Sequence, residues 1–263
     1  MEKKKILEEY KKRLKDYKKY NEAYYNKNKP LINDAEFDKI KKNLIKLEKK
    51  FDFLINPESP TFTVGFKPSK NFKKAPHKVP MLSLSNAFTE EDLKNFEKKV
   101  LNFINENQDY NITYSAEPKI DGISASLIYK NGKFFKGLSR GDGKEGEDIT
   151  ENLKTLEDIP QKVTNKDFPN EIDIRGEVFI KNSDFKKIAN KFANPRNAAS
   201  GSLRQKDPNE TKKIPLKFIA YTFGYEKGLK VENQIDFLKK IDEWGFKTNP
   251  LNKLVTGIDN LLI

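Results

Sequence analysis

The sequence has 263 residues, of which 34% are charged and 36% hydrophobic, and its formal net charge at pH 7 is +12. It holds no cysteine and one histidine, which excludes disulfide bonds and metal sites built from thiolates. With 19 Phe and 10 Tyr it can build a hydrophobic core, which excludes an intrinsically disordered chain. No apolar run is long enough to span a membrane, and the N-terminus lacks the apolar core of a secretion signal.

The positive charge favours a polyanionic partner, although lysine richness can also be a compositional habit of a whole genome. The use of arginine is more informative, because only five of the 51 Lys and Arg residues are Arg. A guanidinium group binds phosphate or carboxylate through two parallel hydrogen bonds, which lysine cannot do. Four arginines lie in Gly- or Asn-rich segments or on an apolar strand and are candidates for a ligand site: Arg140, Arg175, Arg196 and Arg204.

The N-terminal part of the chain predicts two helices. Apolar residues recur at helical spacing over residues 2–27. Asn33 is placed to cap a second helix, and Glu36 would complete a capping box. Asp34 and Asp38 lie four residues apart near the start of this second helix. They can stabilise the helix dipole or face a cationic ligand, and the spacing leaves both interpretations open.

Residues 52–80 lack periodicity and contain several prolines, which predicts a linker or a wrapped loop. The run at 81–86 is short and apolar, a pattern typical of an inner strand. Thr89 then opens a third helix, with acidic residues at 90–92 in its first turn.

The central motif is Glu-Pro-Lys-Ile-Asp-Gly at 117–122, between two predicted strands at 112–116 and 123–129. An Asn-Gly turn at 131–132 then predicts a hairpin into a further strand. Lys119 is therefore expected in a tight turn at a sheet edge, where a neutral amine can act as a nucleophile. In a lysine-rich chain the same pattern can arise by chance or mark a plain hairpin, so the motif alone leaves the function open.

Two later segments also carry candidate residues. Three glycines near Arg140 give a backbone that can approach a ligand closely, and the acidic pair at 147–148 is placed to open a helix. The strand predicted at 172–180 carries Arg175 and Glu177 on one face. A buried Glu177 needs a partner, which is either Arg175 or a ligand hydroxyl.

The remaining segments are a polar run of small residues at 192–205, an aromatic strand at 216–224 and a helix at 233–244. The polar run contains two arginines eight residues apart, which suits contact with backbone phosphates. A capped helix start is the simpler interpretation of its Asn-Pro sequence.

Taken together, these blocks resemble the bacterial NAD-dependent DNA ligase family over essentially the whole chain. The segments that carry the resemblance are 33–38, 59–61, 64–65, 80–86, 117–122, 140–143, 175–179 and 193–205. The Lys-x-Asp-Gly pattern alone is shared with ATP-dependent ligases, RNA ligases and capping enzymes. The N-terminal helical pair and the Asn-Pro-Arg-Asn run are specific to the NAD class.

The resemblance implies an α+β fold with two parts. Residues 1–68 would form a small helical subdomain, with its linker, that recognises the nicotinamide mononucleotide half of NAD. Residues 69–263 would form a nucleotidyltransferase (adenylation) domain with antiparallel sheets flanked by helices. The family continues with two further lysine-bearing motifs and several more domains that this sequence does not contain. We therefore expect the adenylation domain to be incomplete at its C-terminus.

The resemblance also implies a reaction. Lys119 would attack the α-phosphorus of NAD, release nicotinamide mononucleotide and become lysyl-AMP. The AMP would pass to the 5′-phosphate of a DNA nick, and the 3′-hydroxyl would then displace it. NAD as AMP donor, Mg²⁺ and nicked double-stranded DNA are the implied ligands. A monomer in the bacterial cytoplasm, associated with the nucleoid, is the implied setting.

The resemblance assigns the remaining site residues, none of them a metal ligand. Nicotinamide mononucleotide would contact Tyr24, Asp34, Phe37 and Asp38. The nucleotide pocket would contain Ser83, Leu84, Glu117, Arg140, Glu177 and Tyr221, with Glu117 reading the adenine and Tyr221 stacking on it. DNA phosphates would contact Arg196 and Arg204. Tyr25 stands where many relatives have His, and Phe37 where they usually have Tyr, so both changes bear on NAD affinity.

Three alternatives remain at this point. The chain can be a truncated, non-catalytic remnant that still binds NAD or nucleic acid, an ATP-dependent nucleotidyltransferase, or a basic DNA-binding protein without chemistry. The N-terminal helices argue against ATP, which has no nicotinamide to recognise. We expect nucleotide recognition to be largely present, self-adenylation to be impaired or lost and nick sealing to be absent in the isolated chain.

Overall fold

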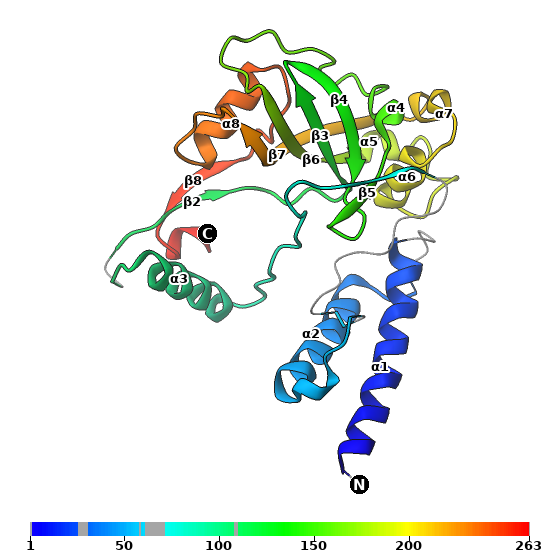
Figure 1. Cartoon of the computed structure of the whole chain (residues 1–263), viewed down its shortest axis with the longest axis vertical. Coiled ribbons are helices and arrows are strands. Elements are labelled where there is room, and N and C mark those ends of the chain that lie inside the picture. The colour runs from blue at the N-terminus through cyan, green and yellow to red at the C-terminus, as the bar shows by residue number, and fades with distance from the viewer. Residues whose placement is uncertain (1, 26–30, 58, 61–71, 108–109, 263) are drawn as a thin grey trace.

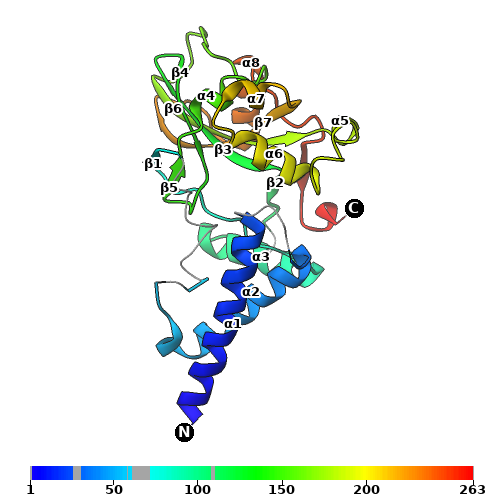
Figure 2. The same cartoon turned by 90° about the vertical axis from the view of Figure 1, so that its right-hand side faces the viewer.

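A computed structural model describes residues 2–25, 31–57, 59–60, 72–107 and 110–262, with only the backbone at residues 2, 24, 25, 34 and 35. A pair of helices lies below a larger unit of strands and helices in two perpendicular views (Figures 1 and 2). This arrangement confirms the predicted α+β class, with N-terminal helices followed by antiparallel sheets flanked by helices.

The helical pair is built around an apolar seam. Its elements are α1 (Glu2–Tyr25), α2 (Asp34–Lys50) and the short 3₁₀ helix η1 (Asp52–Leu54). The buried residues of the seam are Tyr10, Leu14, Tyr17, Phe37, Leu44 and Leu54. The capping box at the start of α2 is confirmed, because Asn33 Oδ1 accepts a hydrogen bond from the backbone N–H of Glu36 at 2.9 Å.

The larger unit is organised by a four-stranded antiparallel sheet in the order β4-β3-β6-β7. Its strands are β3 (Ile123–Lys130), β4 (Lys133–Ser139), β6 (Glu171–Ile180) and β7 (Leu216–Lys227). The predicted hairpin between β3 and β4 is confirmed, since Asn131 and Gly132 both have positive φ, of 49° and 72°. Positive φ at both central residues is typical of a type I′ turn, whose twist matches that of the two strands in a two-residue hairpin.

Two small sheets flank the large one. β1 (Lys74–Pro76) pairs with β5 (Glu145–Glu147), and β2 (Thr113–Ala116) pairs with β8 (Lys253–Thr256). The strands predicted on either side of Lys119 therefore exist, but they belong to different sheets. Lys119 lies in the connection between the β2–β8 ribbon and the large sheet, and not in a hairpin.

Helices surround these sheets. They are α3 (Glu90–Ile104), α4 (Thr150–Leu153), α5 (Asn182–Phe185), α6 (Pro195–Leu203), α7 (Pro208–Lys212), α8 (Gln234–Glu243) and the 3₁₀ helix η2 (Asp259–Leu261). The cap of α3 at Thr89 is as predicted. The helix expected from the acidic pair at 147–148 starts only at Thr150, because Glu147 is the last residue of β5.

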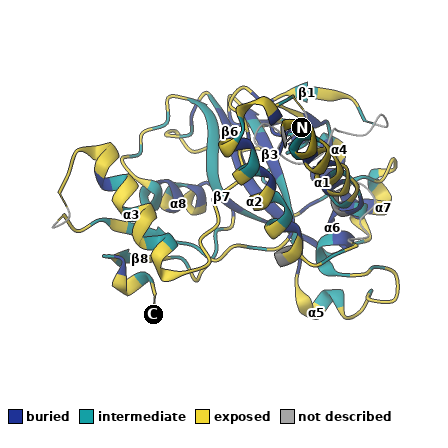
Figure 3. Cartoon of the chain, turned by 90° about the horizontal axis from the view of Figure 1, so that it is seen from below, coloured by how far each residue is buried: buried dark blue, intermediate teal, exposed yellow. Residues whose placement is uncertain are grey.

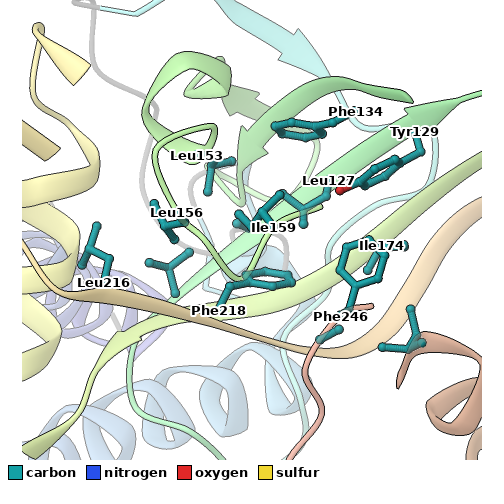
Figure 4. Packing of buried hydrophobic residues seen from close by; sticks show 14 of the residues in the cluster. Leu127, Tyr129, Phe134, Leu153, Leu156, Ile159, Ile174, Leu216, Phe218 and Phe246 are labelled. Atoms are coloured by element: carbon teal, nitrogen blue, oxygen red, sulfur yellow. The ribbon is translucent and has the colours of Figure 1, made fainter. Parts of the chain in front are cut away.

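The two faces of the large sheet differ in character. One face packs its alternate residues into the apolar core, among them Leu127, Tyr129 and Ile174 (Figure 4). Side chains alternate along a strand, so the remaining residues of β3 and β6, such as Ser126 and Glu177, occupy the opposite face. Figure 3 shows that burial is concentrated in the sheet, whereas α1 and α3 are largely exposed. The polar face is where the candidate site forms.

Candidate active site

Lys119 lies on an exposed loop that is fixed at its end by a close backbone approach. A Cβ atom at Gly122 would lie 2.3 Å from the carbonyl oxygen of Val178 on β6, so glycine alone lets the loop pack there. Asp121, beside Lys119, accepts a hydrogen bond on Oδ1 from Arg196 Nη1 at 3.1 Å. The loop therefore presents its lysine between strand β6 and the start of helix α6.

Glu177 is a buried carboxylate on which the charge of this lysine acts. Its Oε2 accepts a hydrogen bond from Ser124 Oγ at 2.9 Å, and its side chain is on the polar face of β6. Burial raises the pKa of Glu177, and this effect is opposed by the Ser124 bond and by three cations. These cations are Arg196, Lys119 and Arg140. One carboxylate thus interacts electrostatically with three of the predicted site residues, and the two arginines among them can bind phosphate oxygens.

Tyr221, on strand β7, is a further predicted site residue. The register of β7 against β6 shifts between Arg175 and Gly176, and Tyr221 is the extra residue of β7 at that shift. Such bulges re-aim a side chain and are common beside active sites. Burial raises the pKa of Tyr221, and the charge of Glu177 raises it further. Tyr221 is therefore an electrostatic neighbour of Glu177 and Arg140, and its stacking on adenine stays a prediction.

Glu117 is held by a residue that the sequence motifs did not identify. Its Oε1 accepts hydrogen bonds from Ser115 Oγ and from Gln234 Nε2, both at 2.9 Å. Gln234 begins helix α8, and its amide also donates to the carbonyl oxygen of Tyr221 at 2.6 Å. Gln234 thereby joins the expected adenine-reading carboxylate to the expected stacking ring. Its sequence context is an ordinary helix start, so no local signal marks it.

Arg175 does not pair with Glu177, which corrects one of the two interpretations of that strand. Its guanidinium bonds to Asp173 Oδ2, from Nε at 3.1 Å and from Nη2 at 3.0 Å. Its Nη1 and Nη2 also donate to the carbonyl oxygens of Pro80 and Val79. This buried arginine is therefore structural, because it binds the chain just before the predicted adenine-pocket residues Ser83 and Leu84.

The segment that carries Ser83 and Leu84 is exposed and is not a strand, so the inner strand suggested by its apolar composition is wrong. Leu84 is 78% exposed. The physical reason is that, among the described residues, the one backbone hydrogen bond of the segment is at its start, where Met81 N–H donates to the carbonyl oxygen of Gly143 at 2.8 Å. The structure brings this segment to Arg175 but buries neither predicted side chain.

The two arginines predicted to contact DNA are both engaged within the chain. Arg196 lies at the start of α6 and bonds to Asp121. Arg204 follows α6 and donates from Nε to Glu147 Oε2 at 2.9 Å. The Asn-Pro sequence before Arg196 does form a capped helix start, with Asn194 as the N-cap residue.

In the helical pair, the predicted nicotinamide contacts are partly described. Phe37 is 7% exposed and stacks on Tyr17 with ring centroids 5.3 Å apart, so it is part of the helical core. Asp38 Oδ2 accepts a hydrogen bond from Asn86 Nδ2 at 2.8 Å, which joins α2 to the segment before α3. The side chains of Tyr24 and Asp34 lie outside the described residues.

Among the described residues, no group of three or more His, Asp and Glu side chains is arranged to hold a metal ion. No helix in the described part of the chain is both long and apolar enough to cross a membrane. The candidate site residues described above are Glu177, Arg140, Arg196 and the exposed Lys119.

Comparison with known proteins gives the class of this fold and site. The family model of the NAD-dependent DNA ligase adenylation domain matches residues 69–263. The model of the DNA ligase-like, N-terminal NAD+-binding domain matches residues 3–65. The larger unit is thus an adenylation domain, and the chain belongs to the NAD-dependent DNA ligase family.

Several curated relatives support this assignment. A DNA ligase of Pelagibacter ubique is 66% identical over 243 residues, which cover 92% of this chain and 36% of the relative. DNA ligases of Bradyrhizobium sp. (strain ORS 278) and Hahella chejuensis are each 42% identical and cover 97% and 92% of this chain. The chain spans 36–37% of the length of these three relatives.

Proposed function

We propose that this chain carries the adenylation step of an NAD-dependent DNA ligase. Residues 1–68 form the helical part that recognises nicotinamide mononucleotide, and residues 69–263 form the adenylation part. Lys119 is the nucleophile, and NAD donates the AMP. The observation that supports the proposal is that the charges of Lys119, Arg140 and Arg196 all act on the buried carboxylate of Glu177 on the polar face of the sheet.

The first step forms one bond and breaks another. The Nζ lone pair of the neutral Lys119 amine forms a nitrogen–phosphorus bond to the α-phosphorus of NAD, and this nitrogen releases one proton to water. The phosphorus–oxygen bond to nicotinamide mononucleotide breaks, and this group leaves with the bonding electrons. Arg140 and Arg196 stabilise the negative charge that develops on the phosphate oxygens. Glu177 is placed to hold these cations and to accept a hydrogen bond from a ribose hydroxyl.

The base and the leaving group are recognised at the two ends of the NAD molecule. Glu117, held by Gln234, reads the adenine, while Tyr221 stacks on it and Ser83 and Leu84 complete the pocket. Asp38, together with Tyr24, Asp34 and Phe37, recognises nicotinamide mononucleotide. Asp38 must exchange its hydrogen bond to Asn86 for the ligand. Such an exchange couples ligand binding to the position of α2.

The later steps belong to the whole ligase. AMP moves from Lys119 to the 5′-phosphate of a nick in double-stranded DNA, and the 3′-hydroxyl then displaces AMP and seals the strand during replication and repair. Arg196 and Arg204 are the proposed phosphate contacts. Mg²⁺ is expected on the phosphates of the nucleotide, because it usually binds through substrate phosphates and few carboxylates. A monomer acting with DNA in the bacterial cytoplasm suffices for this scheme.

The experiment that tests the proposal is the mass of the intact protein after incubation with Mg²⁺ and either NAD or ATP. A gain of one adenylyl group with NAD alone, absent in Lys119→Ala, would support the proposal and show that this chain retains self-adenylation. A gain with ATP instead would assign the chain to the ATP-dependent class. No gain with NAD, together with saturable NAD binding by calorimetry, would favour a non-catalytic remnant. The intact Lys119, Glu117 and Glu177 support the enzymatic proposal.

A further inference from the structure

His77, the single histidine of the sequence, is buried against the loop that carries Arg140. Its ring Nε2 lies 3.1 Å from the carbonyl oxygen of Arg140. A carbonyl oxygen can only accept a hydrogen bond, so Nε2 carries the proton and donates it. The contact spans 63 residues of sequence and involves the residue that is proposed to bind the nucleotide phosphate or ribose.

The other ring nitrogen indicates the protonation state. Nδ1 is buried and has no hydrogen-bond partner within the described part of the chain. The ring lines a small cavity together with Lys78, Glu171 and Asp173. Burial lowers the pKa of His77, and the Arg140 carbonyl and the charge of Asp173 oppose that effect. A ring that is neutral at pH 7 fits this geometry, because an imidazolium would bury an additional N–H donor.

The Arg140 loop depends on contacts from outside itself. Gly141 and Gly143 have φ of 59° and 90°, so the backbone of the loop is left-handed at these two glycines. Strand β1 pairs with β5 at the end of the loop. The backbone N–H of His77 donates to the carbonyl oxygen of Lys144 at 2.8 Å. A Cβ atom at Gly146 would lie 3.0 Å from His77 Nε2, so a glycine there leaves room for the ring.

We propose that His77 is a positioning residue: its Nε2–H holds the carbonyl of Arg140 and thereby orients the Arg140 guanidinium toward Glu177 and the bound nucleotide. This inference rests on the proposed function, in which Arg140 contacts the nucleotide. The histidine belongs to the segment that leads from the helical pair into the sheet. The position of that segment therefore determines the position of a nucleotide-binding arginine.

The single histidine makes the test specific, because only one imidazole appears in a ¹⁵N NMR spectrum of the chain. At pH 7 the expected state is the neutral tautomer with the proton on Nε2. Saturation with AMP is expected to shift both imidazole nitrogen signals. A proton on Nδ1, or signals that do not respond to saturating AMP, would overturn the proposal.

Two variants separate positioning from packing. His77→Gln keeps an N–H donor at about the distance of Nε2, while His77→Leu fills a similar volume without a donor. We expect His77→Leu to bind AMP about tenfold more weakly by calorimetry, which corresponds to about 1.4 kcal/mol. His77→Gln is expected to restore most of the affinity. Equal affinities of the two variants and the wild type would overturn the proposal.

A double-mutant cycle with Arg140→Ala identifies the route of the effect. If His77 acts through Arg140, His77→Leu causes no further loss of AMP affinity in the Arg140→Ala background. A full tenfold loss in that background would overturn the positioning role. If the wild-type protein binds neither AMP nor NAD, the proposed function is refuted. The tautomer measurement needs no ligand, so it would still decide whether His77 donates a hydrogen bond to Arg140. If His77→Leu fails to fold, the response of the wild-type imidazole nitrogen signals to AMP decides whether the proposal stands.

Discussion

Arg204 donates from Nε to Oε2 of Glu147 at 2.9 Å, and the Glu147 side chain has no exposed surface. The pair joins the end of helix α6 to the last residue of strand β5. A buried carboxylate needs a charged or hydrogen-bonding partner, and losing one is strongly destabilising. Arg204 therefore has a structural role in the free protein besides any contact with DNA phosphates.

We predict that Arg204→Ala lowers the free energy of unfolding by about 3 kcal/mol. The matched control is Arg196→Ala, whose partner Asp121 has a side chain that is 71% exposed, so its loss is expected to cost less than about 1 kcal/mol. Urea denaturation of the three proteins measures both changes. Equal stability of the two variants would show that the Arg204–Glu147 pair contributes little. A loss of ligation in Arg204→Ala should thus be interpreted only after its stability is known.

The buried carboxylate of the site is predicted to destabilise the free protein at neutral pH. Burial raises the pKa of Glu177 above its usual value of 4.5, so the folded state binds this proton more tightly than the unfolded state. Stability is then lost as the pH rises from about 4.5 through the folded pKa, and the penalty is fully present above it. Glu177→Gln removes the charge and should raise stability at pH 7 by about 1 kcal/mol.

The control for this prediction is Glu171→Gln on the same strand. A hydrogen bond from Lys78 lowers the pKa of Glu171, so its charge favours folding above the unfolded pKa and its removal should not stabilise the protein. Thermal unfolding at pH 4 and pH 7 compares both variants with the wild type. The advantage of Glu177→Gln should shrink at pH 4. A constant advantage at both pH values would contradict the linkage.

Local patterns in the sequence predict part of this structure because caps, turns and nucleophile motifs are short-range features. The capping boxes at Asn33 and Thr89 and the turn at Asn131 formed as expected. The motifs around Lys119 and Glu177 indicated two residues whose charges interact, and their roles in a site stay predictions. In each case the deciding residues are close together along the chain or form a recognisable motif.

Contacts between distant segments were not predictable in this way. Strand β2 pairs with β8, with Tyr114 opposite Val255, and neither segment carries a pattern that selects the other. The guanidinium of Arg175 also donates to the carbonyl oxygen of Val79, which lies 96 residues away in the sequence, and no periodicity reveals this approach. Tertiary packing determines which partner a buried group contacts, so the sequence left both Arg175 and a ligand hydroxyl open as partners of Glu177.

Gly224 is predicted to be essential for the Arg175–Asp173 pair. A Cβ atom there would lie 2.3 Å from both Arg175 Nη2 and Asp173 Oδ2. The guanidinium cannot simply move away, because it also binds two backbone carbonyls. Gly224→Ala should therefore destabilise the fold by about 3 kcal/mol.

The control is Gly201→Ala in helix α6, where the nearest atom to the added Cβ lies at 3.7 Å in Phe192. Alanine is the better helix former, so this change is expected to stabilise the protein by about 0.5 kcal/mol. Urea midpoints should move in opposite directions for the two glycine variants. Shifts of the same sign and size would show that crowding at Gly224 is relieved without breaking the buried pair.

Gln234 provides the sharpest test of how adenine is recognised. Its amide bonds to both Glu117 and the carbonyl of Tyr221, so removing it frees the carboxylate that is proposed to read the base. A hydrogen bond to a charged group contributes about 1.5 kcal/mol or more, and we therefore predict that Gln234→Leu weakens AMP binding at least about tenfold by calorimetry. Gln161→Leu is the control, since its amide bonds the carbonyl of Ile159 two residues away. Unchanged AMP affinity in Gln234→Leu would mean that Glu117 keeps its orientation without this amide, and that Ser115, its other hydrogen-bond donor, is sufficient.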